Sequence, residues 1–375
     1  MKILMTGGGT GGHVYPAIAI AETLKANFPD VEIAFVGTPR GIENKICRSA
    51  GYRIYHVDIM GIKRSLSPSN IKALYLATVS PRRAKKIIDE FKPDAVIGTG
   101  GYVCWPLCVA ASRAGIPTIL HESNVYPGLA VRKLQKKVDK ILLNFSDTAG
   151  YLKAETAERL VTVGNPLRGG FSSMKREDAR GKLGIETVGQ KMILSYGGSR
   201  GAGRINEVMI EFMKKYAPSH PDVIHVHATG DIGAAAFRER FAAEGLDKLE
   251  NIKIYEYIED MPVKMAAADV VICRAGAMTV SEIAMMKKPA IFIPSPNVAE
   301  NHQFKNAKLL ADNGAAVVME EKDLSPDGLY KAIDRLLYDD KARADMAEKA
   351  GSFSNSNANK QIYDEIIRLI NQRMK

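Results

Sequence analysis

Residues 2–16 read KILMTGGGTGGHVYP. The apolar run at residues 2–6 is typical of a buried parallel strand, and glycine fills five of the six positions 7–12 before a helical pattern begins. Glycines at a strand-to-helix turn let the backbone approach an anion, which the helix N-terminus also attracts. His13 follows the turn and could transfer a proton there. The stretch therefore predicts an anion site beside a side chain capable of catalysis.

The same turn also fits the dinucleotide-binding pattern G-x-G-x-x-G, with glycines at Gly7, Gly9 and Gly12. That pattern expects an acidic residue about 20 residues further on, at the end of the next strand. The next predicted strand, at residues 31–36, is followed by GTPR, which contains no carboxylate. The missing carboxylate disfavours a dinucleotide-dependent enzyme. An NADP-dependent oxidoreductase stays an alternative, because the last residue of GTPR, Arg40, could meet a 2′-phosphate.

The composition of the 375 residues, 46% hydrophobic and 25% charged, is that of a globular protein large enough for two domains. No apolar stretch approaches the roughly 18 residues of a membrane span, and the N-terminus enters a strand without a signal peptide. The four cysteines are scattered, which favours reduced core thiols in a cytoplasmic protein: Cys47, Cys104, Cys108 and Cys273.

The net charge of +10 is concentrated in the first half, where residues 1–165 carry 22 lysines and arginines against 13 acids. This asymmetry indicates an anionic partner, which could be nucleic acid, a phosphate-bearing substrate or an acidic membrane surface. The sequence lacks the aromatic platforms or basic recognition helix of a nucleic-acid-binding protein, so we expect no nucleic-acid partner.

Short apolar runs alternate with helical patterns along the whole chain. The strands predicted from them are 2–6, 31–36, 53–57, 94–98, 117–121, 138–143 and 160–163, then 191–196, 223–228, 252–255, 269–273, 289–293 and 315–318. The chain ends in helical patterns at about 325–338, 341–350 and 357–372. Alternation of this kind predicts parallel sheets covered by helices.

The pattern restarts after a Pro/Gly-punctuated stretch near residue 165, and residues 197–203 form a second glycine-rich turn. We therefore expect an α/β fold with two Rossmann-like domains facing across a cleft, residues 1–165 and 166–350. A C-terminal helix in 351–375 is expected to pack back on the first domain. Ligands of such sheets bind at the carboxyl ends of the strands.

A compact cluster in the second half follows the strand at 269–273. Thr279 is a plausible N-cap with Glu282 as its capping-box partner, which would give both a structural role. Alternatively, Glu282 could accept hydrogen bonds from two adjacent hydroxyls, as on a ribose, and spacing alone does not decide between the two. The loop at 294–303, rich in Pro, Asn and Gln, suits sugar hydroxyls or is a plain surface loop. His121-Glu122 also ends a strand, where binding residues gather.

Residues 63–92 combine eight basic residues with two acids. Ile71, Leu74, Tyr75 and Val79 are interleaved at helical spacing, which slightly favours an amphipathic helix that packs this stripe on the sheet. The alternative is an apolar patch ringed by bases that rests on anionic lipid, together with the loop at 60–69. Both can hold if only the loop and the basic end touch the membrane.

No P-loop, zinc motif, nucleophile elbow or Asp-x-Asp pair is present in the sequence. We therefore expect no metal site and no cofactor, with any diphosphate held by backbone donors and helix ends.

Taken in order, these motifs closely resemble the MurG family of peptidoglycan N-acetylglucosaminyltransferases. The resemblance spans nearly the whole chain and rests on GGTGGH at 8–13, GTGGY at 98–102, HESN at 121–124, GNPLR at 164–168, GGS at 197–199, YIEDM at 257–261, AMTVSE at 277–282 and HQ at 302–303. It implies the GT-B fold and an inverting transfer of N-acetylglucosamine from its UDP form. The implied acceptor is the muramyl 4-hydroxyl of lipid I (undecaprenyl-pyrophosphoryl-muramyl-pentapeptide), which gives lipid II at the cytoplasmic membrane face.

The resemblance places the donor mostly against the second domain, with the backbone of Ile258 at uracil and Glu282 at the ribose hydroxyls. It puts two residues along the diphosphate and three near the sugar: Ser199 and Arg168, then Ala277, Gln303 and Asn124. The same turn adds Met278, Thr279, Val280 and Ser281 to the substrate-binding set.

On the acceptor side, the resemblance implies that Thr10, Gly11 and Gly12 line a loop near the acceptor diphosphate. His13 would be the general base, with Glu122 as a supporting residue. Two stretches depart from the family pattern: Cys104-Trp105-Pro106 replaces small residues, and Arg200 stands where many members have Gln. The acceptor side carries the least signal, so a UDP-sugar-dependent transferase for another lipid, of diacylglycerol type, is the alternative.

Overall fold

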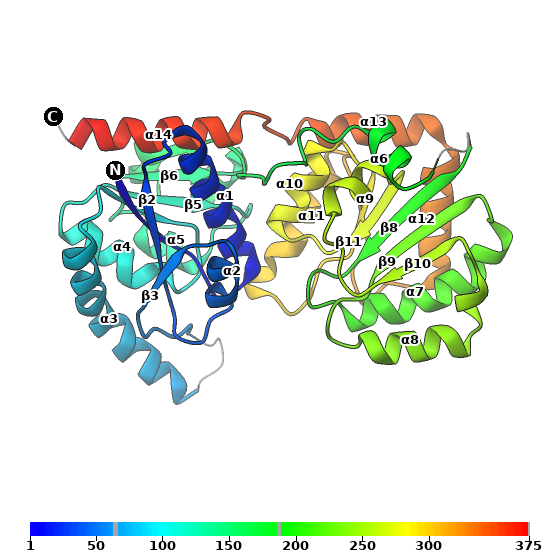
Figure 1. The fold of residues 1–375 in the computed structure, drawn as a ribbon, viewed down its shortest axis with the longest axis horizontal. Helices are drawn as coiled ribbons and strands as arrows, with labels where there is room; N and C mark the ends of the chain where they lie inside the picture. The colour runs from blue at the N-terminus through cyan, green and yellow to red at the C-terminus, as the bar shows by residue number, and fades with distance from the viewer. Residues whose placement is uncertain (63–66, 186–188, 374–375) are drawn as a thin grey trace. The chain divides into compact units, whose positions relative to one another are not determined.

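The computed structural model describes residues 1–62, 67–185 and 189–373. It divides into two compact units (Figure 1). Unit 1 comprises residues 1–167 together with the C-terminal segment from Asn355 onward, and unit 2 comprises Arg168–Ser354. Each unit is built on its own parallel sheet covered by helices, so the predicted fold class of two Rossmann-like α/β units is confirmed.

The described part of unit 1 forms a seven-stranded parallel sheet in the order β3-β2-β1-β4-β5-β6-β7. Its strands are β1 Lys2–Thr6, β2 Glu32–Gly37, β3 Arg53–His56, β4 Ala95–Gly98, β5 Thr118–Glu122, β6 Lys140–Leu143 and β7 Leu160–Thr162. The central strand β1 pairs with β2 and β4, which sets Leu4 opposite both Ala34 and Val96. A parallel sheet buried on both faces explains why these strands are continuously apolar.

Helices cover both faces of this sheet. They are α1 Gly11–Asn27, α2 Glu43–Ser49, α3 Ser69–Phe91, α4 Cys104–Arg113, α5 Leu129–Leu134 and α14 Ala358–Arg373, with 3-10 turns η1 Ser146–Tyr151 and η2 Ala154–Arg159. Alternate side chains of a strand face opposite ways, so Ile3 and Met5 join a core with α1 and α14. Leu4 joins the opposite core, with α3 and α4. The helix α14 packs against α1 and completes its face of the sheet (Figure 1).

Within the described residues, unit 2 holds a six-stranded parallel sheet in the order β10-β9-β8-β11-β12-β13. Its strands are β8 Lys191–Tyr196, β9 Val223–Ala228, β10 Ile252–Tyr255, β11 Val270–Cys273, β12 Ala290–Phe292 and β13 Val317–Val318. Its helices are α6 Arg176–Lys182, α7 Gly203–Tyr216, α8 Ala234–Ala243, α9 Met261–Ala267, α10 Ala277–Met285, α11 His302–Asp312, α12 Pro326–Tyr338 and α13 Asp340–Gly351, with 3-10 turns η3 Ala217–Ser219, η4 Leu246–Lys248 and η5 Ala299–Asn301.

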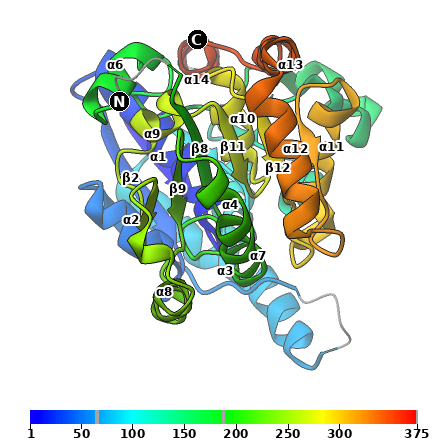
Figure 2. The ribbon, with the colours of Figure 1, turned by 90° about the vertical axis from the view of Figure 1, so that its right-hand side faces the viewer.

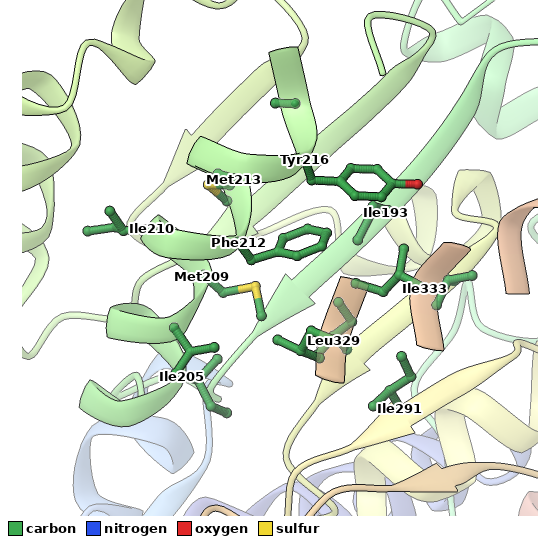
Figure 3. Packing of buried hydrophobic residues seen from close by; sticks show 14 of the residues in the cluster. Ile193, Ile205, Met209, Ile210, Phe212, Met213, Tyr216, Ile291, Leu329 and Ile333 are labelled. Atoms are coloured by element: carbon green, nitrogen blue, oxygen red, sulfur yellow. The ribbon is translucent and has the colours of Figure 1, made fainter. Parts of the chain in front are cut away.

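The core of unit 2 lies where α7 and α12 cover one face of the sheet. Figure 3 shows Phe212 of α7 among Ile193 of β8, Ile291 of β12 and Leu329 of α12. These side chains are fully or almost fully buried. The amphipathic pattern of α7 and α12 thus packs both helices on this face of the sheet, which positions the loops that precede them.

The predicted strands are confirmed, with bounds that differ by at most two residues at either end. The three C-terminal helical patterns are likewise confirmed as α12, α13 and α14. In the part of the chain that the structure describes, no helix is both long and apolar enough to cross a bilayer.

The expected packing of the stripe at residues 71–79 on the sheet is wrong. Ile71, Leu74 and Tyr75 of α3 are 74%, 57% and 64% exposed. The buried stripe of α3 instead consists largely of small residues in its first half: Ala73, Leu76, Ser80, Pro81 and Ala84, continued by Ile87, Ile88 and Phe91. The N-terminal half of α3 extends away from the rest of unit 1 (Figure 1; Figure 2). Lys63 and Arg64 of the basic region lie outside the described residues.

Both sheets reverse their strand order at one point, between β1 and β4 in unit 1 and between β8 and β11 in unit 2. The loops after two such strands leave in opposite directions, which opens the carboxyl edge of the sheet between them. Ligands of doubly wound sheets bind at this point. The glycine-rich turns at residues 7–12 and 197–203 both lie at such a reversal.

Candidate active site

The imidazole of His13 lies in the first turn of α1, at the carboxyl end of β1. Its Nδ1 is 3.2 Å from the carbonyl oxygen of Gly8 and 3.2 Å from Oγ1 of Thr10. A carbonyl oxygen can only accept a hydrogen bond, so the contact with Gly8 requires the proton on Nδ1. In the neutral ring, Nε2 is then the basic nitrogen. The loop therefore holds His13 in the tautomer that a general base needs.

The neighbouring turn after β4 packs against the His13 ring. A Cβ atom at Gly100 would lie 2.6 Å from Cδ2 of His13, and one at Gly101 would lie 2.3 Å from the carbonyl oxygen of Gly8. Both glycines have positive φ angles, of 109° and 79°. The hydroxyl of Thr99 donates to the His13 carbonyl at 2.6 Å, which ties α1 to the end of β4. The motif GTGGY thus matters because glycine alone leaves room for the imidazole.

The predicted acceptor-loop residues lie where an anion could approach. Thr10 is the N-cap of α1, with extended backbone angles, and Gly11 and Gly12 are the first residues of the helix. Thr10 and Gly12 are exposed and Gly11 is half-buried. The first N–H groups of a helix lack acceptors within that helix, and the 17-residue α1 adds its dipole there.

Glu122, at the end of β5, is 4% exposed and holds its own loop. Its Oε1 accepts from the backbone N–H and the side-chain amide of Asn124, at 2.9 and 3.1 Å, and its Oε2 accepts from the N–H of Gly128 at 2.7 Å. Burial raises the pKa of this carboxyl, and these hydrogen bonds oppose the rise. Glu122 is therefore built to position Asn124.

The neighbouring His121 is fully buried, and its Nε2 contacts the carbonyl oxygen of Gly164 at 2.9 Å. Burial lowers the pKa of His121 to about 4, so the ring is neutral at physiological pH. The expectation that binding residues gather at this strand end therefore does not extend to His121, because its side chain belongs to the interior.

The unusual Cys104-Trp105-Pro106 stretch is accommodated within unit 1. The thiol of Cys104 donates to the carbonyl oxygen of Gly100 at 2.9 Å, in the turn that packs against His13. The indole N–H of Trp105 donates to the carbonyl oxygen of Ala77 in α3 at 2.9 Å. These residues therefore join α4 to the glycine turn and to α3.

In unit 2, the second glycine-rich turn packs against its neighbour backbone to backbone. A Cβ atom at Gly201 would lie 2.1 Å from the carbonyl oxygen of Thr229, and one at Gly230 would lie 2.0 Å from the nitrogen of Gly201. Ser199 and Arg200 are exposed in the turn that precedes α7. This end of α7 suits a phosphate for the same reason as the first turn of α1.

The capping explanation for Thr279 and Glu282 is wrong. The helix α10 begins at Ala277 with Gly276 as its N-cap, so Thr279 lies within the first turn and Glu282 in the second. Burial raises the pKa of the half-buried Glu282 carboxyl to about 7, and the positive charge of Arg168 opposes this rise. A carboxyl group that no cap uses and that titrates near neutrality is available for a ligand.

Apart from Asn124, the remaining residues predicted for the donor also belong to unit 2. Ile258 follows β10 and is 4% exposed, and the exposed Arg168 is the first residue of the unit. Ala277, Val280 and Ser281 are buried, whereas Met278 and Thr279 are half-buried. The side-chain oxygen of Gln303 accepts from the N–H of Ser295 at 2.9 Å and so fixes the loop after β12. The predicted sites thus separate into six residues of unit 1 and ten of unit 2.

Sequence comparison identifies the class of protein that this fold and these loops define. Residues 3–143 match the model of the glycosyltransferase family 28 N-terminal domain, and residues 192–364 match that of the family 28 C-terminal domain. The chain is therefore a glycosyltransferase of GT-B type.

Curated relatives narrow this class. A protein of Caldanaerobacter subterraneus is 42% identical over 97% of this chain and 98% of its own length, and one of Acetivibrio thermocellus is 42% identical over 98% and 97%. Both are named UDP-N-acetylglucosamine--N-acetylmuramyl-(pentapeptide) pyrophosphoryl-undecaprenol N-acetylglucosamine transferase. The crystal structure of Acinetobacter baumannii MurG matches with a TM-score of 0.76 and 29% identity, over 98% of this chain and 99% of that one. The chain belongs to the MurG family.

Glu43 was not predicted from the sequence. No acid directly follows β2, but Glu43, six residues beyond its end, brings its carboxylate back to Thr38. This carboxylate accepts from the backbone of the glycine-rich turn, so it does not await a ribose as the dinucleotide pattern requires. The sequence signal for Glu43 is the set of glycines that surround its side chain, at positions 8, 37 and 41.

Replacing Gly100 with alanine should displace the imidazole of His13, because the new methyl group would overlap the ring. We expect Gly100→Ala to lower the glycosyl-transfer rate with the family's substrates at least about a hundredfold, the lower end of the range for loss of general-base catalysis. Gly115→Ala is the matched control, since Gly115 also has a positive φ, of 70°, but no atom within 4 Å of the added carbon. Equal activity losses in the two folded variants would contradict this role of Gly100.

Proposed function

We propose that this chain transfers N-acetylglucosamine, with inversion, from UDP-N-acetylglucosamine to the muramyl 4-hydroxyl of lipid I, and so makes lipid II for peptidoglycan. The observation that carries this proposal is 42% identity over 97% of the chain to a relative whose name states the transfer. The tautomer of His13 supports it independently, because the reaction needs a base at the acceptor hydroxyl.

In this proposal, unit 2 binds the donor. The backbone of Ile258 binds uracil, and the ionised carboxylate of Glu282 accepts from the ribose hydroxyls. Ser199, Arg168 and the N-termini of α7 and α10 face the diphosphate. The residues Ala277, Met278, Thr279, Val280, Ser281 and Gln303 line the path from the diphosphate to the sugar. The long helix α7 and the charge of Arg168 offset negative charge on UDP as it leaves.

Unit 1 binds the acceptor and supplies the base. The Nε2 atom of His13 takes the proton from the 4-hydroxyl while that oxygen attacks the anomeric carbon opposite UDP. The bond from the anomeric carbon to the β-phosphate oxygen breaks, and UDP leaves with its electron pair. The carbonyl oxygen of Gly8 stabilises the imidazolium through Nδ1–H. Thr10, Gly11 and Gly12 hold the acceptor diphosphate, and Glu122 positions Asn124 toward the sugar.

Release of UDP from UDP-N-acetylglucosamine in the presence of a lipid I analogue tests this function. We expect release that requires the analogue, with kcat reduced at least about a hundredfold in His13→Ala and little change in donor affinity. Full activity in His13→Ala would remove His13 as the base while leaving the overall reaction in place. Release that requires a diacylglycerol in place of lipid I would contradict the assigned acceptor.

We further propose that this is a peripheral protein that binds the cytoplasmic face of the cell membrane through α3. Ile71, Leu74 and Tyr75 expose apolar surface on the end of α3 that extends from unit 1. Met60 and Ile62, 36% and 50% exposed, precede that helix in the chain. Lys72 stands within this apolar surface, and further bases follow along α3. Exposed apolar side chains on a helix that also carries bases fit an anionic lipid surface.

Vesicles of phosphatidylglycerol should bind the protein more strongly than vesicles of phosphatidylcholine, and added salt should weaken the binding. We expect the triple variant Ile71→Ser, Leu74→Ser, Tyr75→Ser to bind at least about tenfold more weakly, since each buried apolar side chain contributes roughly 1.5–3 kcal/mol. Ile232→Ser, at a 56% exposed apolar site of unit 2, is the control and should bind as wild type. Unchanged sedimentation of the triple variant would exclude α3 as the membrane contact.

A further inference from the structure

A buried carboxylate lies directly beneath the glycine-rich turn of unit 1. Glu43, at the start of α2, is 1% exposed. Its Oε2 accepts from the backbone N–H of Gly9 at 3.3 Å. Its Oε1 accepts from the N–H of Thr38 at 2.8 Å and from the Thr38 hydroxyl at 2.7 Å. The side chain thus joins the loop after β2 to the loop that carries His13.

The two loops are shaped around this carboxylate. A Cβ atom would lie 2.8 Å from the carboxyl carbon at Gly8, 2.6 Å from Cγ of Glu43 at Gly37, and 2.1 Å from Oε1 at Gly41. None of these three glycines has a positive φ, so their backbone conformation alone does not demand glycine. They are needed because Glu43 fills the space where their side chains would be.

The hydrogen bond from Gly9 has a consequence on the opposite side of the turn. The N–H of Gly9 and the carbonyl of Gly8 belong to the same peptide group, and in a planar trans peptide they point in opposite directions. Glu43 accepts from the N–H end, and Nδ1 of His13 lies 3.2 Å from the carbonyl end. The Gly8–Gly9 peptide therefore links the carboxylate to the imidazole.

This arrangement orders His13 in two ways. The anchored N–H fixes the plane of the peptide, so the Gly8 carbonyl stays directed at Nδ1. The carboxylate also polarises the peptide, which makes the Gly8 oxygen a stronger acceptor, because hydrogen bonds in a chain reinforce one another. Both effects favour the tautomer with the proton on Nδ1, and both stabilise the imidazolium that forms when Nε2 takes a proton.

The outer side of the turn is also braced. The ring of Tyr102 stands against Gly9, whose added Cβ would lie 3.0 Å from Cε1 of that ring. Gly9 itself has a φ of 83°, which a residue with a side chain rarely adopts. With Glu43 beneath it and Tyr102 over it, the Gly8–Gly9 peptide has little freedom to turn over.

We propose that Glu43 is a positioning residue that sets the tautomer of His13 through the Gly8–Gly9 peptide. The proposal rests on the proposed function only for the step in which His13 acts as the base. It gives the carboxylate the orienting role of the acid in a Ser-His-Asp triad, with one peptide group inserted between acid and imidazole.

Glu43→Gln tests this role. The NH2 group of glutamine donates hydrogen bonds and cannot accept them. It therefore loses the hydrogen bond from the N–H that it faces, either that of Gly9 or that of Thr38. We expect kcat to fall about tenfold to a hundredfold, with the KM for UDP-N-acetylglucosamine unchanged because the donor is bound by unit 2. Thr38→Val is the matched control, since it removes one hydrogen bond to Glu43 but leaves the bond from Gly9. It should lower thermal stability yet keep kcat within about twofold of wild type.

The tautomer itself gives a readout that needs no turnover. In protein with 15N-labelled histidine, the imidazole signals of His13 can be assigned by comparison with His13→Ala. We expect the Nδ1–H form in wild type and in Thr38→Val, and a mixture of tautomers in Glu43→Gln. If wild type transfers no sugar, the proposed function fails, whereas this spectrum still tests the action of Glu43 on His13.

An unchanged His13 tautomer in folded Glu43→Gln would overturn the proposal, as would equal kcat losses in Glu43→Gln and Thr38→Val. Should Glu43→Gln fail to fold, Glu43→Asp provides the same test. Its carboxylate is one methylene shorter, which first weakens the 3.3 Å bond from Gly9. We expect a smaller loss of kcat and a partial tautomer shift in this variant, and wild-type behaviour would contradict the proposal.

Discussion

The reversal of strand order beside one central strand of each sheet is the constraint on which the candidate site residues of both units depend. In unit 1, β1 pairs with β2 and β4, and in unit 2, β8 pairs with β9 and β11. The chain must leave such a strand on one face of the sheet and return on the other, so a turn and a helix N-terminus lie at the carboxyl end. The glycine-rich turns occupy these two places.

Three carboxylates show how burial and hydrogen bonding divide structural from chemical roles. Glu43 and Glu122 are nearly inaccessible, and backbone N–H groups of the loops that they support donate to them. Glu282 is half-buried in the second turn of α10, and its pKa is raised to about 7. The first two carboxylates give shape to loops of unit 1, whereas the third is suited to hydroxyl groups of a ligand.

The strands and the glycine turns could be predicted because continuous apolar runs bounded by glycine leave few alternatives for a parallel sheet. The orientation of α3 could not. Its inner face is made largely of small residues such as Ala73 and Ala84, whose hydrophobic signal is weaker than that of the exposed Ile71 and Leu74. Glu43 was missed because its role depends on a hydrogen bond back to Thr38, five residues earlier in the chain. The choice between capping and ligand roles for Thr279 and Glu282 stayed open because spacing alone does not reveal that α10 starts at Ala277.

The division of labour between the units is the central claim, and the affinity for UDP-N-acetylglucosamine as a function of pH tests it most directly. If the ionised carboxylate of Glu282 binds the ribose, calorimetric titration should show about tenfold tighter binding at pH 8 than at pH 6, as expected for a group with a pKa near 7. Glu282→Gln should bind weakly and equally at both pH values, and His13→Ala should retain the wild-type affinities. Wild-type donor binding by Glu282→Gln, or its loss in His13→Ala, would contradict the account.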